Sequence, residues 1–434
     1  MSTKFAGVKG MNDLRSPQIE IWQRIEGIAR SLFARYGYSE IRTPIVEETA
    51  LFVRSVGEVT EIVGKEMYTF TDKGDRSISM RPEGTAPAAR AYIEHSIANT
   101  EPLTRWFYMG PMFRYERMKT GRYRQFYQLG AEAYGALDPA QDVEVIALCD
   151  AFFKQIGVPD VVLHLNSLGD GSTRPAYLEA LKQHFAPVLE VMSAEAKLAY
   201  EKNTMRLLDS KEPALQDAIA SAPTILDSID EGSKKHFDDV QRMLTKLGIP
   251  FELDRRLVRG LDYYTRTTFE FIYQPKGENA LGTAGTVCGG GRYDRLVHEL
   301  GGPEKPAVGF AMGLDRLVLL VEKLKPVERG GPTLFIGTFE GPERDDAIAL
   351  VMRLRNEGFD VDFDPRGGNK LGKQKERASK VNAAWFAGYG GDEHKSGKLK
   401  IDNMRLPKDA PREQVEISLD GLRAWLNAAS KRPS

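Results

Sequence analysis

The chain has 434 residues, a formal net charge of −1 and 41% hydrophobic residues. This composition is typical of a soluble globular protein with more than one domain, and it excludes a chain that is mainly disordered or basic throughout. The two cysteines and six histidines show no metal-ligand spacing, and no stretch reaches the roughly 18 apolar residues of a membrane span. We therefore expect a cytoplasmic protein with no membrane partner and no protein-held structural metal.

The N-terminal part of the chain predicts a helix followed by a strand. Ser16-Pro17 is a typical helix start, in which a hydroxyl caps the first turn and proline takes the first helical position. Apolar residues then recur at helical spacing until Gly37 ends the helix. Residues 38–47 predict a strand that reaches Pro44.

The segment Arg81–Pro87 places a carboxylate in a turn. Glu83 lies between Pro82 and Gly84, and a helix is expected to follow. A carboxylate there either caps the next helix or pairs with the amine of a ligand. The residues alone favour the capping role.

The next segment predicts a basic β-hairpin. Residues 105–116 and 124–135 are rich in aromatic residues and form its two strands. From residue 105 to residue 124 there are six Lys or Arg side chains and one carboxylate, Glu116. Such a cluster fits either a solvated face or a bound anion, and arginine suits a phosphate because its planar group forms two parallel hydrogen bonds.

The second strand of this hairpin indicates which face carries chemistry. Because side chains alternate along a strand, Gln128, Gly130 and Glu132 share one face, and Leu129 belongs to the opposite, buried face. A glycine inside a strand often marks the close approach of a ligand, so we interpret Gly130 as a gap for one. A carboxylate and an amide beside arginines can hold a zwitterion together with a polyphosphate.

Residues 174–248 are helical in pattern and rich in charge. Residues 257–273 are dense in aromatic and β-branched residues and predict a strand. Arg259 lies near its start. We interpret it first as a structural arginine, and the alternative is that its side chain reaches over the face of the sheet. A strand at 307–313 and a helix from residue 314 follow.

Arg316 lies in the first turn of the helix that begins at residue 314. A cation there opposes the helix dipole, a conflict that a polyphosphate between the arginine and the helix end would remove.

Residues 326–331 predict a linker, and the chain after it alternates between strands and helices. This alternation predicts a separate α/β domain over residues 332–434 with a partly parallel sheet. Residues 366–400 carry nine Lys or Arg and three Asp or Glu, which favours contact with a nucleic-acid backbone. Residues 367–374 have the spacing of a phosphate-binding loop but end in glutamine, so we regard that match as false.

Taken together, these segments resemble the histidyl-tRNA synthetase family of class II aminoacyl-tRNA synthetases over nearly the whole chain. The three motifs of the class are matched by residues 36–44, 113–132 and 309–316. Segments specific to the family are matched by residues 81–85, 257–270 and 289–294.

The resemblance implies an α+β catalytic domain on a mainly antiparallel sheet over residues 1–325. It also implies a helical insertion at about 174–248 and an α/β anticodon-binding domain at 332–434. The protein is then expected to be a homodimer and a histidine–tRNA ligase. L-Histidine and ATP, with Mg²⁺, would form histidyl-adenylate and pyrophosphate, and histidine would pass to the 3′ end of histidine tRNA.

The resemblance also implies roles for individual residues. The histidine-binding positions are Glu83, Gly84, Thr85, Arg114, Gln128, Glu132, Arg259, Tyr263, Tyr264 and Tyr293. The ATP-binding positions are Arg114, Arg122 and Arg316. Within these sets, Glu132 and Tyr264 match the pair that reads the imidazole ring. Arg259 and Arg114 match the catalytic arginines at the α-phosphate, where other class II enzymes place a metal.

The hairpin loop departs from the family pattern. Arg117 and Lys119 match positions that meet the acceptor end of the tRNA, but many members have Pro-Gln where this chain has Met118-Lys119. How the extra 5′ nucleotide of histidine tRNA is read is therefore left open by the sequence.

One alternative is a non-catalytic paralogue that acts as the regulatory subunit of ATP phosphoribosyltransferase. That subunit typically lacks the arginine-containing segment and the anticodon domain. Arg259 and the residues after the linker therefore favour the ligase.

Overall fold

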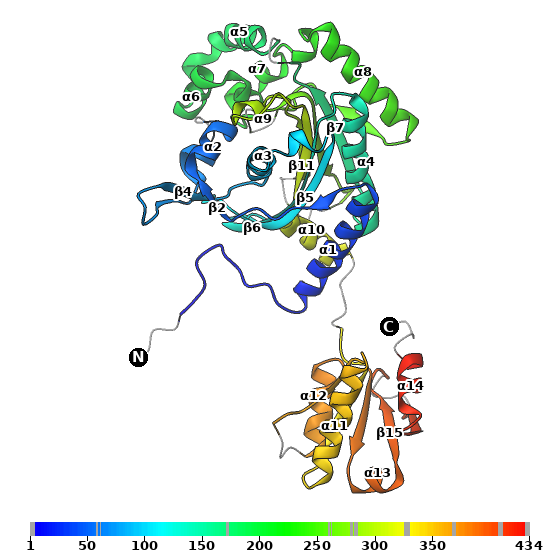
Figure 1. Ribbon diagram of the computed structural model, residues 1–434. Helices are drawn as coiled ribbons and strands as arrows, with labels where there is room; N and C mark the ends of the chain where they lie inside the picture. The colour runs from blue at the N-terminus through cyan, green and yellow to red at the C-terminus, as the bar shows by residue number, and fades with distance from the viewer. Residues whose placement is uncertain are drawn as a thin grey trace. The chain divides into compact units, whose positions relative to one another are not determined.

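The computed structural model describes residues 5–57, 60, 62–170, 173–258, 261, 263–277, 281, 285–324, 330–366, 370–406 and 411–429. The chain divides into two compact units, Met1–Val327 and Glu328–Ser434 (Figure 1). In the described part, no helix is long and apolar enough to cross a membrane.

An eight-stranded sheet forms the centre of the first unit, in the order β1-β5-β6-β11-β10-β9-β7-β8. Its strands are Ser39–Glu40 (β1), Thr104–Phe113 (β5), Gln125–Tyr134 (β6), Val161–Ser167 (β7), Phe251–Leu253 (β8), Thr265–Tyr273 (β9), Thr286–Arg292 (β10) and Ala307–Gly313 (β11). The pairs β1–β5 and β7–β8 are parallel, and the other pairs are antiparallel. The predicted mainly antiparallel sheet and the β5–β6 hairpin are confirmed.

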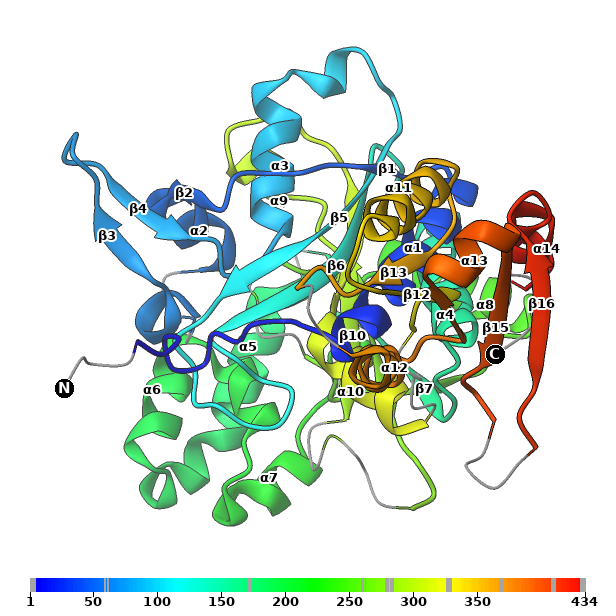
Figure 2. The same cartoon turned by 90° about the horizontal axis from the view of Figure 1, so that it is seen from below.

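A second, three-stranded sheet lies beside α2 (Thr49–Val56) and consists of Val46–Glu48 (β2), Thr69–Thr71 (β3) and Ser77–Met80 (β4) (Figure 2). The single strand predicted at residues 38–47 is therefore wrong, because this segment is divided between two sheets. Pro44, which has no N–H to donate to a ladder, lies in the break. In this break the carbonyl oxygen of Thr43 accepts a hydrogen bond from one Nη atom of the buried Arg81 at 2.9 Å, in place of a bond to a neighbouring strand.

Helices cover one face of the large sheet and make the main core. These helices are Gln18–Arg35 (α1), Pro139–Ile156 (α4), Glu231–Lys246 (α8) and Leu314–Leu324 (α10). Leu129 and Ala131 of β6 are buried among them, as the alternation predicts. The helix after Ser16-Pro17 is confirmed, although the Ser16 hydroxyl donates to the Glu20 carboxylate instead of capping the first turn. The opposite face of the sheet is left for other elements.

Helices predominate from residue 173 to residue 246, and no described residue there is in a strand. They are Thr173–Phe185 (α5), Ala186–Val191 (η3), Ala194–Lys202 (α6), Thr204–Asp209 (η4), Pro213–Leu215 (η5), Gln216–Ala220 (α7), Ile225–Asp227 (η6) and α8. The remaining helices that the structure describes in this unit are Ile62–Glu66 (η1), Thr85–Glu94 (α3), Ile97–Asn99 (η2) and Leu296–Glu299 (α9).

The strand predicted at residues 257–273 is only partly correct. Ladder pairing with β7 and β10 begins at Thr265, and the backbone N–H of Leu257 donates to the carbonyl of Asp254 in a turn. Tyr263 and Tyr264 therefore precede the strand. Their aromatic character reflects burial in a pocket wall, which a propensity scale does not distinguish from burial in a sheet.

The second unit has a five-stranded sheet in the order β13-β12-β14-β15-β16. Its strands are Leu334–Thr338 (β12), Val361–Phe363 (β13), Trp385–Tyr389 (β14), Lys398–Asn403 (β15) and Gln414–Ser418 (β16). The helices are Glu343–Asn356 (α11), Leu371–Lys380 (α12), Gly391–Ser396 (α13) and Leu422–Ala429 (α14). β12 runs parallel to β13 and β14, and the other pairs are antiparallel, so the partly parallel sheet is confirmed.

Candidate active site

A cavity of about 670 Å³ opens on the face of the large sheet that the core helices do not cover. Most of the side chains singled out from the sequence line it, namely Glu83, Thr85, Arg114, Arg122, Gln128, Tyr263, Tyr264 and Arg316. They come from the start of α3, the β5–β6 hairpin, the segment before β9 and the start of α10. Arg259 lies outside the described residues.

Behind the lining of this cavity lie side chains that the sheet register brings onto one face. Tyr108 of β5 pairs with Gly130 of β6, and Glu132 pairs with Gly309 of β11. A Cβ atom at Gly130 or Gly84 would overlap the Tyr108 ring, and one at Gly309 would overlap the Glu132 carboxyl group. The interpretation of Gly130 as a gap for a ligand is therefore wrong, since the ring of Tyr108 fills it.

Glu132 is completely buried and accepts hydrogen bonds from three hydroxyl groups. Its Oε1 accepts from Thr85 Oγ1 at 2.7 Å and from the Tyr108 hydroxyl at 3.1 Å, and its Oε2 accepts from the Tyr293 hydroxyl. Burial raises the pKa of Glu132 to about 8, and the hydroxyl donors limit that rise. Neither Glu132 nor Tyr293 lines the cavity, so both lie one layer behind Thr85.

Glu83 caps the helix that follows it, as the residues alone favour. Its two carboxylate oxygens accept from the backbone N–H groups of Thr85 at 2.7 Å and Ala86 at 2.8 Å. Burial raises the pKa of Glu83 despite these bonds. The carboxylate still lines the cavity, so capping and contact with a ligand are compatible here. Gly84 contributes by leaving room for Tyr108.

Gln128 carries an acceptor that the described residues do not satisfy. Its side chain is 8% exposed, and its Oε1 has no hydrogen-bond partner in the described part of the chain. An unpaired buried acceptor costs about 1–3 kcal/mol, so a donor from a ligand would remove a penalty. An ammonium group between Gln128 and Glu83 meets this requirement.

Three tyrosines form an aromatic wall at the end of the cavity that holds Gln128: Tyr263 and Tyr264 line the cavity, and Tyr293 lies behind them. The ring centroids of Tyr263 and Tyr264 are 4.8 Å apart, and that of Tyr293 lies 5.5 Å from Tyr263 and 6.4 Å from Tyr264. All three side chains are buried. This wall suits a flat, partly polar ring of the size of imidazole.

The other end of the cavity carries positive charge. Arg114 Nε donates to the carbonyl oxygen of Pro82 at 2.9 Å, and one Nη atom of Arg316 donates to the Thr286 carbonyl oxygen. Burial lowers the pKa of Arg316, and the neighbouring charge of Arg122 lowers it further. Two guanidinium groups held near each other repel, and a polyphosphate between them removes the repulsion.

Two carboxylates lie at the same end. Glu116 is 3.4 Å from Arg122, and Glu270 accepts from the Thr286 hydroxyl at 3.0 Å. The described residues contain no group of three or more potential metal-ligating side chains. Mg²⁺ bound to nucleotide phosphates usually needs only one or two protein carboxylates, so the donor set fits that ion.

Part of the hairpin tip lies outside the cavity, although Gly121 and Arg122 line it. Arg117 and Lys119 are exposed and line neither this cavity nor its neighbour. The backbone of Lys119 pairs with that of Arg122 across a turn in which Gly121 adopts a positive φ of 68°. Arg117 and Lys119 are therefore accessible at the surface.

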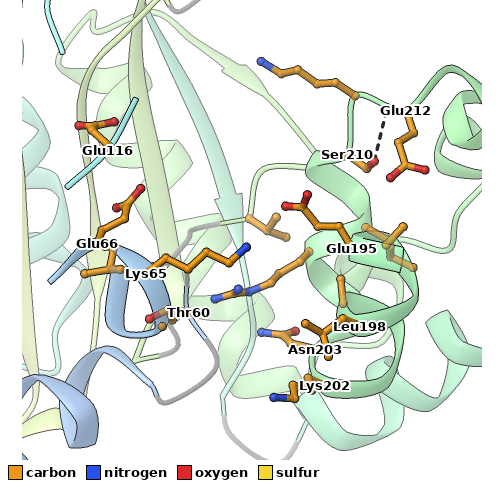
Figure 3. Close-up of a pocket in the computed structure, with 18 of the residues that line it drawn as sticks. Thr60, Lys65, Glu66, Glu116, Glu195, Leu198, Lys202, Asn203, Ser210 and Glu212 are labelled. Atoms are coloured by element: carbon orange, nitrogen blue, oxygen red, sulfur yellow. Dashed lines mark hydrogen bonds between the residues drawn. The ribbon is translucent and has the colours of Figure 1, made fainter. Parts of the chain in front are cut away.

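A second cavity of about 940 Å³ adjoins the first and shares Arg114, Glu116, Arg122, Lys211 and Val258 with it. Figure 3 shows Thr60, Lys65 and Glu66 on one wall and helical residues of the 173–246 segment on the other, among them Glu195, Leu198 and Lys202. The helical segment thus forms the side of a wide opening that leads to the sheet.

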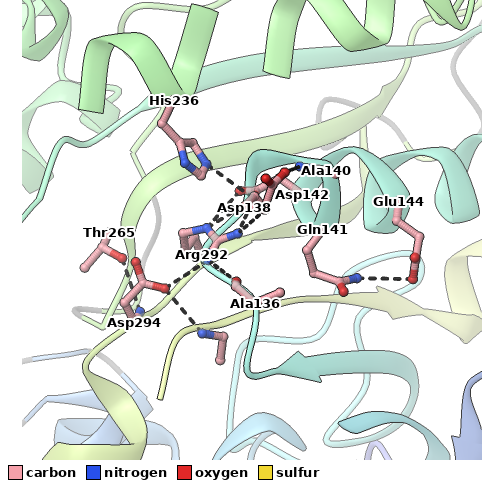
Figure 4. A network of polar contacts seen from close by, with 11 residues as sticks. Ala136, Asp138, Ala140, Gln141, Asp142, Glu144, His236, Thr265, Arg292 and Asp294 are labelled. Atoms are coloured by element: carbon pink, nitrogen blue, oxygen red, sulfur yellow. Dashed lines mark hydrogen bonds and ion pairs between the residues drawn. The ribbon is translucent and has the colours of Figure 1, made fainter. Parts of the chain in front are cut away.

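A buried polar network supports the tyrosine that contacts Glu132. Arg292, which directly precedes Tyr293, has no solvent-exposed side-chain surface and donates from Nε to the Asp142 carboxylate at 3.1 and 3.2 Å (Figure 4). His236 of α8 lies 3.3 Å from the same carboxylate, and Asp294 lies 3.2 Å from Arg292. Burial alone would raise the pKa of Asp142, but Arg292 and His236 outweigh it and hold that pKa below its ordinary value.

Sequence reasoning did not single out Tyr108, Asp142 or Arg292. Tyr108 carried one usable signal, because an antiparallel hairpin of this length pairs a bulky residue with the in-strand glycine. Asp142 and Arg292 are 150 positions apart, and no local pattern joins them.

The fold and the cavity together are those of a class II aminoacyl-tRNA synthetase: a mainly antiparallel sheet carries a cavity with an aromatic, carboxylate-containing end beside an arginine-lined end. The sequence model of histidyl-tRNA synthetases matches residues 10–317, and that of an anticodon-binding domain matches residues 336–429. The chain therefore belongs to the histidyl-tRNA synthetase family.

Individual relatives agree with this assignment. The histidine–tRNA ligase of Anaeromyxobacter sp. (strain K) is 44% identical over 416 residues, which cover 96% of this chain and 99% of the relative. The apo histidyl-tRNA synthetase of Staphylococcus aureus is 36% identical with a TM-score of 0.79, covering 98% of this chain and 100% of that one. A Bacillus halodurans structure described as an ATP phosphoribosyltransferase regulatory subunit/histidyl-tRNA synthetase is 21% identical, with a TM-score of 0.63 and coverage of 89% and 98%, which shows the fold alone.

Proposed function

We propose that this chain is a histidine–tRNA ligase that carries out both steps of its reaction in the 670 Å³ cavity. In the first step a carboxylate oxygen of L-histidine attacks the α-phosphorus of ATP. The bond from that phosphorus to the bridging oxygen breaks, and pyrophosphate leaves. In the second step a hydroxyl of the terminal ribose of histidine tRNA attacks the acyl carbon, and AMP leaves. The observation that carries the proposal is the meeting of an amino-acid pocket and three arginines in one cavity.

The amino-acid end has the chemistry to hold histidine. Glu83 and the unsatisfied Oε1 of Gln128 offer acceptors to the α-ammonium group, and Thr85 lies between them and Glu132. We assign the imidazole ring to the aromatic wall of Tyr263, Tyr264 and Tyr293, with Glu132 as the acceptor for its N–H. A wrong side chain would leave these buried polar groups unpaired, which is how such a pocket rejects it.

The arginine end has the chemistry to hold ATP. We assign Arg114 to the α-phosphate and Arg122 with Arg316 to the γ-phosphate, because negative charge moves onto the phosphate oxygens during the displacement. Arg259 is proposed as the second arginine at the α-phosphate by its match to the family. Glu116 and Glu270 would hold a Mg²⁺ ion that arrives with ATP and neutralises phosphate charge.

The tRNA would approach through the wide opening beside the helical segment. We assign Arg117 and Lys119 to the acceptor end because they are exposed next to that opening, and residues 332–434 to the anticodon. We propose that residues 1–325 form the catalytic domain and residues 326–331 the linker. We also propose that the enzyme is cytoplasmic, because its tRNA and ATP are found there.

We also propose that the protein is a homodimer. The resemblance of residues 36–44 to the first class II motif implies that Pro44 lies at a dimer interface. Apolar side chains in and just before the neighbouring three-stranded sheet are exposed. Ile45 is 42% exposed, Val46 38% and Phe70 47%. Light scattering of the purified protein tests this, and a monomer at micromolar concentration would contradict it.

The regulatory-subunit alternative is not favoured. The anticodon-domain match over residues 336–429 and the full set of phosphate-end arginines Arg114, Arg122 and Arg316 both speak for a ligase.

Amino-acid-dependent ATP–pyrophosphate exchange tests the first step, and charging of histidine tRNA tests the second. We expect exchange with L-histidine and none with the other amino acids. Exchange with a different amino acid, or none at all, would contradict the proposal.

A further inference from the structure

We propose that Tyr108 is a positioning residue for histidine recognition: its hydroxyl fixes the carboxylate of Glu132 and leaves one acceptor position for the ring N–H of the substrate. This inference rests on the proposed function. It concerns a side chain that does not line the cavity and that acts through Glu132.

The ring of Tyr108 is held from both sides by the backbone. It occupies space that a Cβ atom at Gly84 or at Gly130 would need, and its side chain is only 4% exposed. Gly84 comes from the turn before α3 and Gly130 from β6, so two separate elements clamp the ring. The hydroxyl therefore reaches Glu132 from a direction set by the fold and not by a mobile side chain.

The acceptor positions of Glu132 can be counted. A carboxylate offers about four lone-pair positions. Thr85 and Tyr108 fill both positions of Oε1, and Tyr293 fills one position of Oε2. The second position of Oε2 has no donor in the described part of the chain. A ring that brings one N–H toward Glu132 completes the set, whereas a side chain without a donor leaves it incomplete.

The hydroxyl of Tyr108 also favours the charged form of Glu132. Burial raises the pKa of Glu132, and the hydrogen bonds from Tyr293, Thr85 and Tyr108 lower it. The other titratable groups that act on Glu132 or feel its charge are Glu83, Tyr38, Tyr134 and Tyr263. Loss of the Tyr108 hydroxyl would therefore move the pKa of Glu132 upward and reduce the carboxylate present at neutral pH.

The test is Tyr108→Phe, which keeps the ring between Gly84 and Gly130 and removes only the donor. In ATP–pyrophosphate exchange we expect the KM for L-histidine to rise about tenfold, as for loss of a hydrogen bond to a charged group. The KM for ATP should stay within about twofold, because the phosphate end is untouched. The midpoint of the pH profile of kcat/KM for histidine should shift to higher pH.

The matched control is Tyr92→Phe. Tyr92 is a buried tyrosine of α3 whose hydroxyl has no hydrogen-bond partner in the described part of the chain, so its loss should change neither KM nor the pH profile. A second variant, Gly130→Ala, displaces the Tyr108 ring from the other side and should reproduce the selective rise in the KM for histidine.

Two outcomes would overturn the proposal. One is a Tyr108→Phe enzyme with an unchanged KM for histidine and an unchanged pH profile. The other is an equal rise of both KM values together with a lower melting temperature, which would reduce Tyr108 to a packing role. If the wild-type enzyme itself shows no histidine-dependent exchange, the proposed function fails, and this inference fails with it.

Discussion

The two ends of the cavity differ in how their charged groups are stabilised. At the amino-acid end, Glu132 is buried and its hydrogen bonds come from the protein itself. At the phosphate end, Arg122 and Arg316 lie close to each other with like charge, and burial works against the charge of Arg316. The first end is organised before any ligand arrives. The second end holds like charges that repel each other, and the proposed phosphate ligand would remove that repulsion, so the two ends should respond differently to mutation, pH and salt.

The largest expected effect comes from the network behind the amino-acid end. Asp142→Ala leaves the buried Arg292 without its main counter-charge, and removal of one partner of a buried ion pair costs about 3–5 kcal/mol. Urea denaturation should show this loss. Asp150→Ala is the control on the same helix, because its ion pair with Lys154 is at the surface and should contribute at most about 1 kcal/mol. Equal losses in the two variants would mean that the network does not support the site.

The next effect tests the phosphate end. Arg259→Ala should lower the rate of pyrophosphate exchange by about 10³-fold, the usual result of removing a donor to a developing negative charge. The fold should remain intact by circular dichroism. Arg255→Ala is the control, since Arg255 is 59% exposed and 3.7 Å from Asp227. Exchange at the wild-type rate in Arg259→Ala would remove that residue from catalysis.

A smaller effect separates the two ends directly. Arg316→Ala should raise the KM for ATP by about tenfold to 100-fold, because a charge-assisted contact to phosphate is lost, and leave the KM for histidine nearly unchanged. Added salt should narrow the difference between wild type and variant, since it screens the same charge. A parallel rise of both KM values would show that the two ends are not independent.

The smallest expected effect tests the role of Glu132 at the amino-acid end. The pKa of Glu132 is raised to about 8 in the protein without substrate, so the carboxylate form that accepts an N–H increases as the pH rises through this value. We expect kcat/KM for histidine to rise with pH over the same range. Glu132→Gln should raise the KM for histidine about tenfold and abolish this rise while sparing ATP. An unchanged pH profile in that variant would assign the titration to another group.

Much of the fold could be predicted from local pattern. The period-two alternation of residues 124–135 predicted the face that carries Gln128 and Glu132, and the helical spacing before Gly37 predicted α1. Both signals come from one element that buries one side, so neighbouring residues report it. Some elements were missed: the short alternating strands β15 and β16 were not predicted, and residues 38–47 divide between two sheets.

The sequence identified many residues of the candidate site, but it did not predict how these residues pack against one another. The motifs identified Glu83, Gln128 and the phosphate-end arginines, since each lies in a short segment of unusual composition. They did not show that Gly130 makes room for Tyr108 or that Cys149 and Cys288 bring their sulfur atoms within 3.8 Å of each other. Such contacts join strands and helices that are distant in the chain, and packing selects them.

The sequence by itself therefore indicated the elements with a clear period and the side chains that carry charge and polarity, because composition and periodicity are local properties, and its motifs indicated the family by resemblance. Only the tertiary structure decided that Glu132 lies behind the cavity under three hydroxyl groups and that Arg292 supports Tyr293 from a buried network. These facts depend on which residues of different elements fill the same space, and close packing of the folded chain settles that.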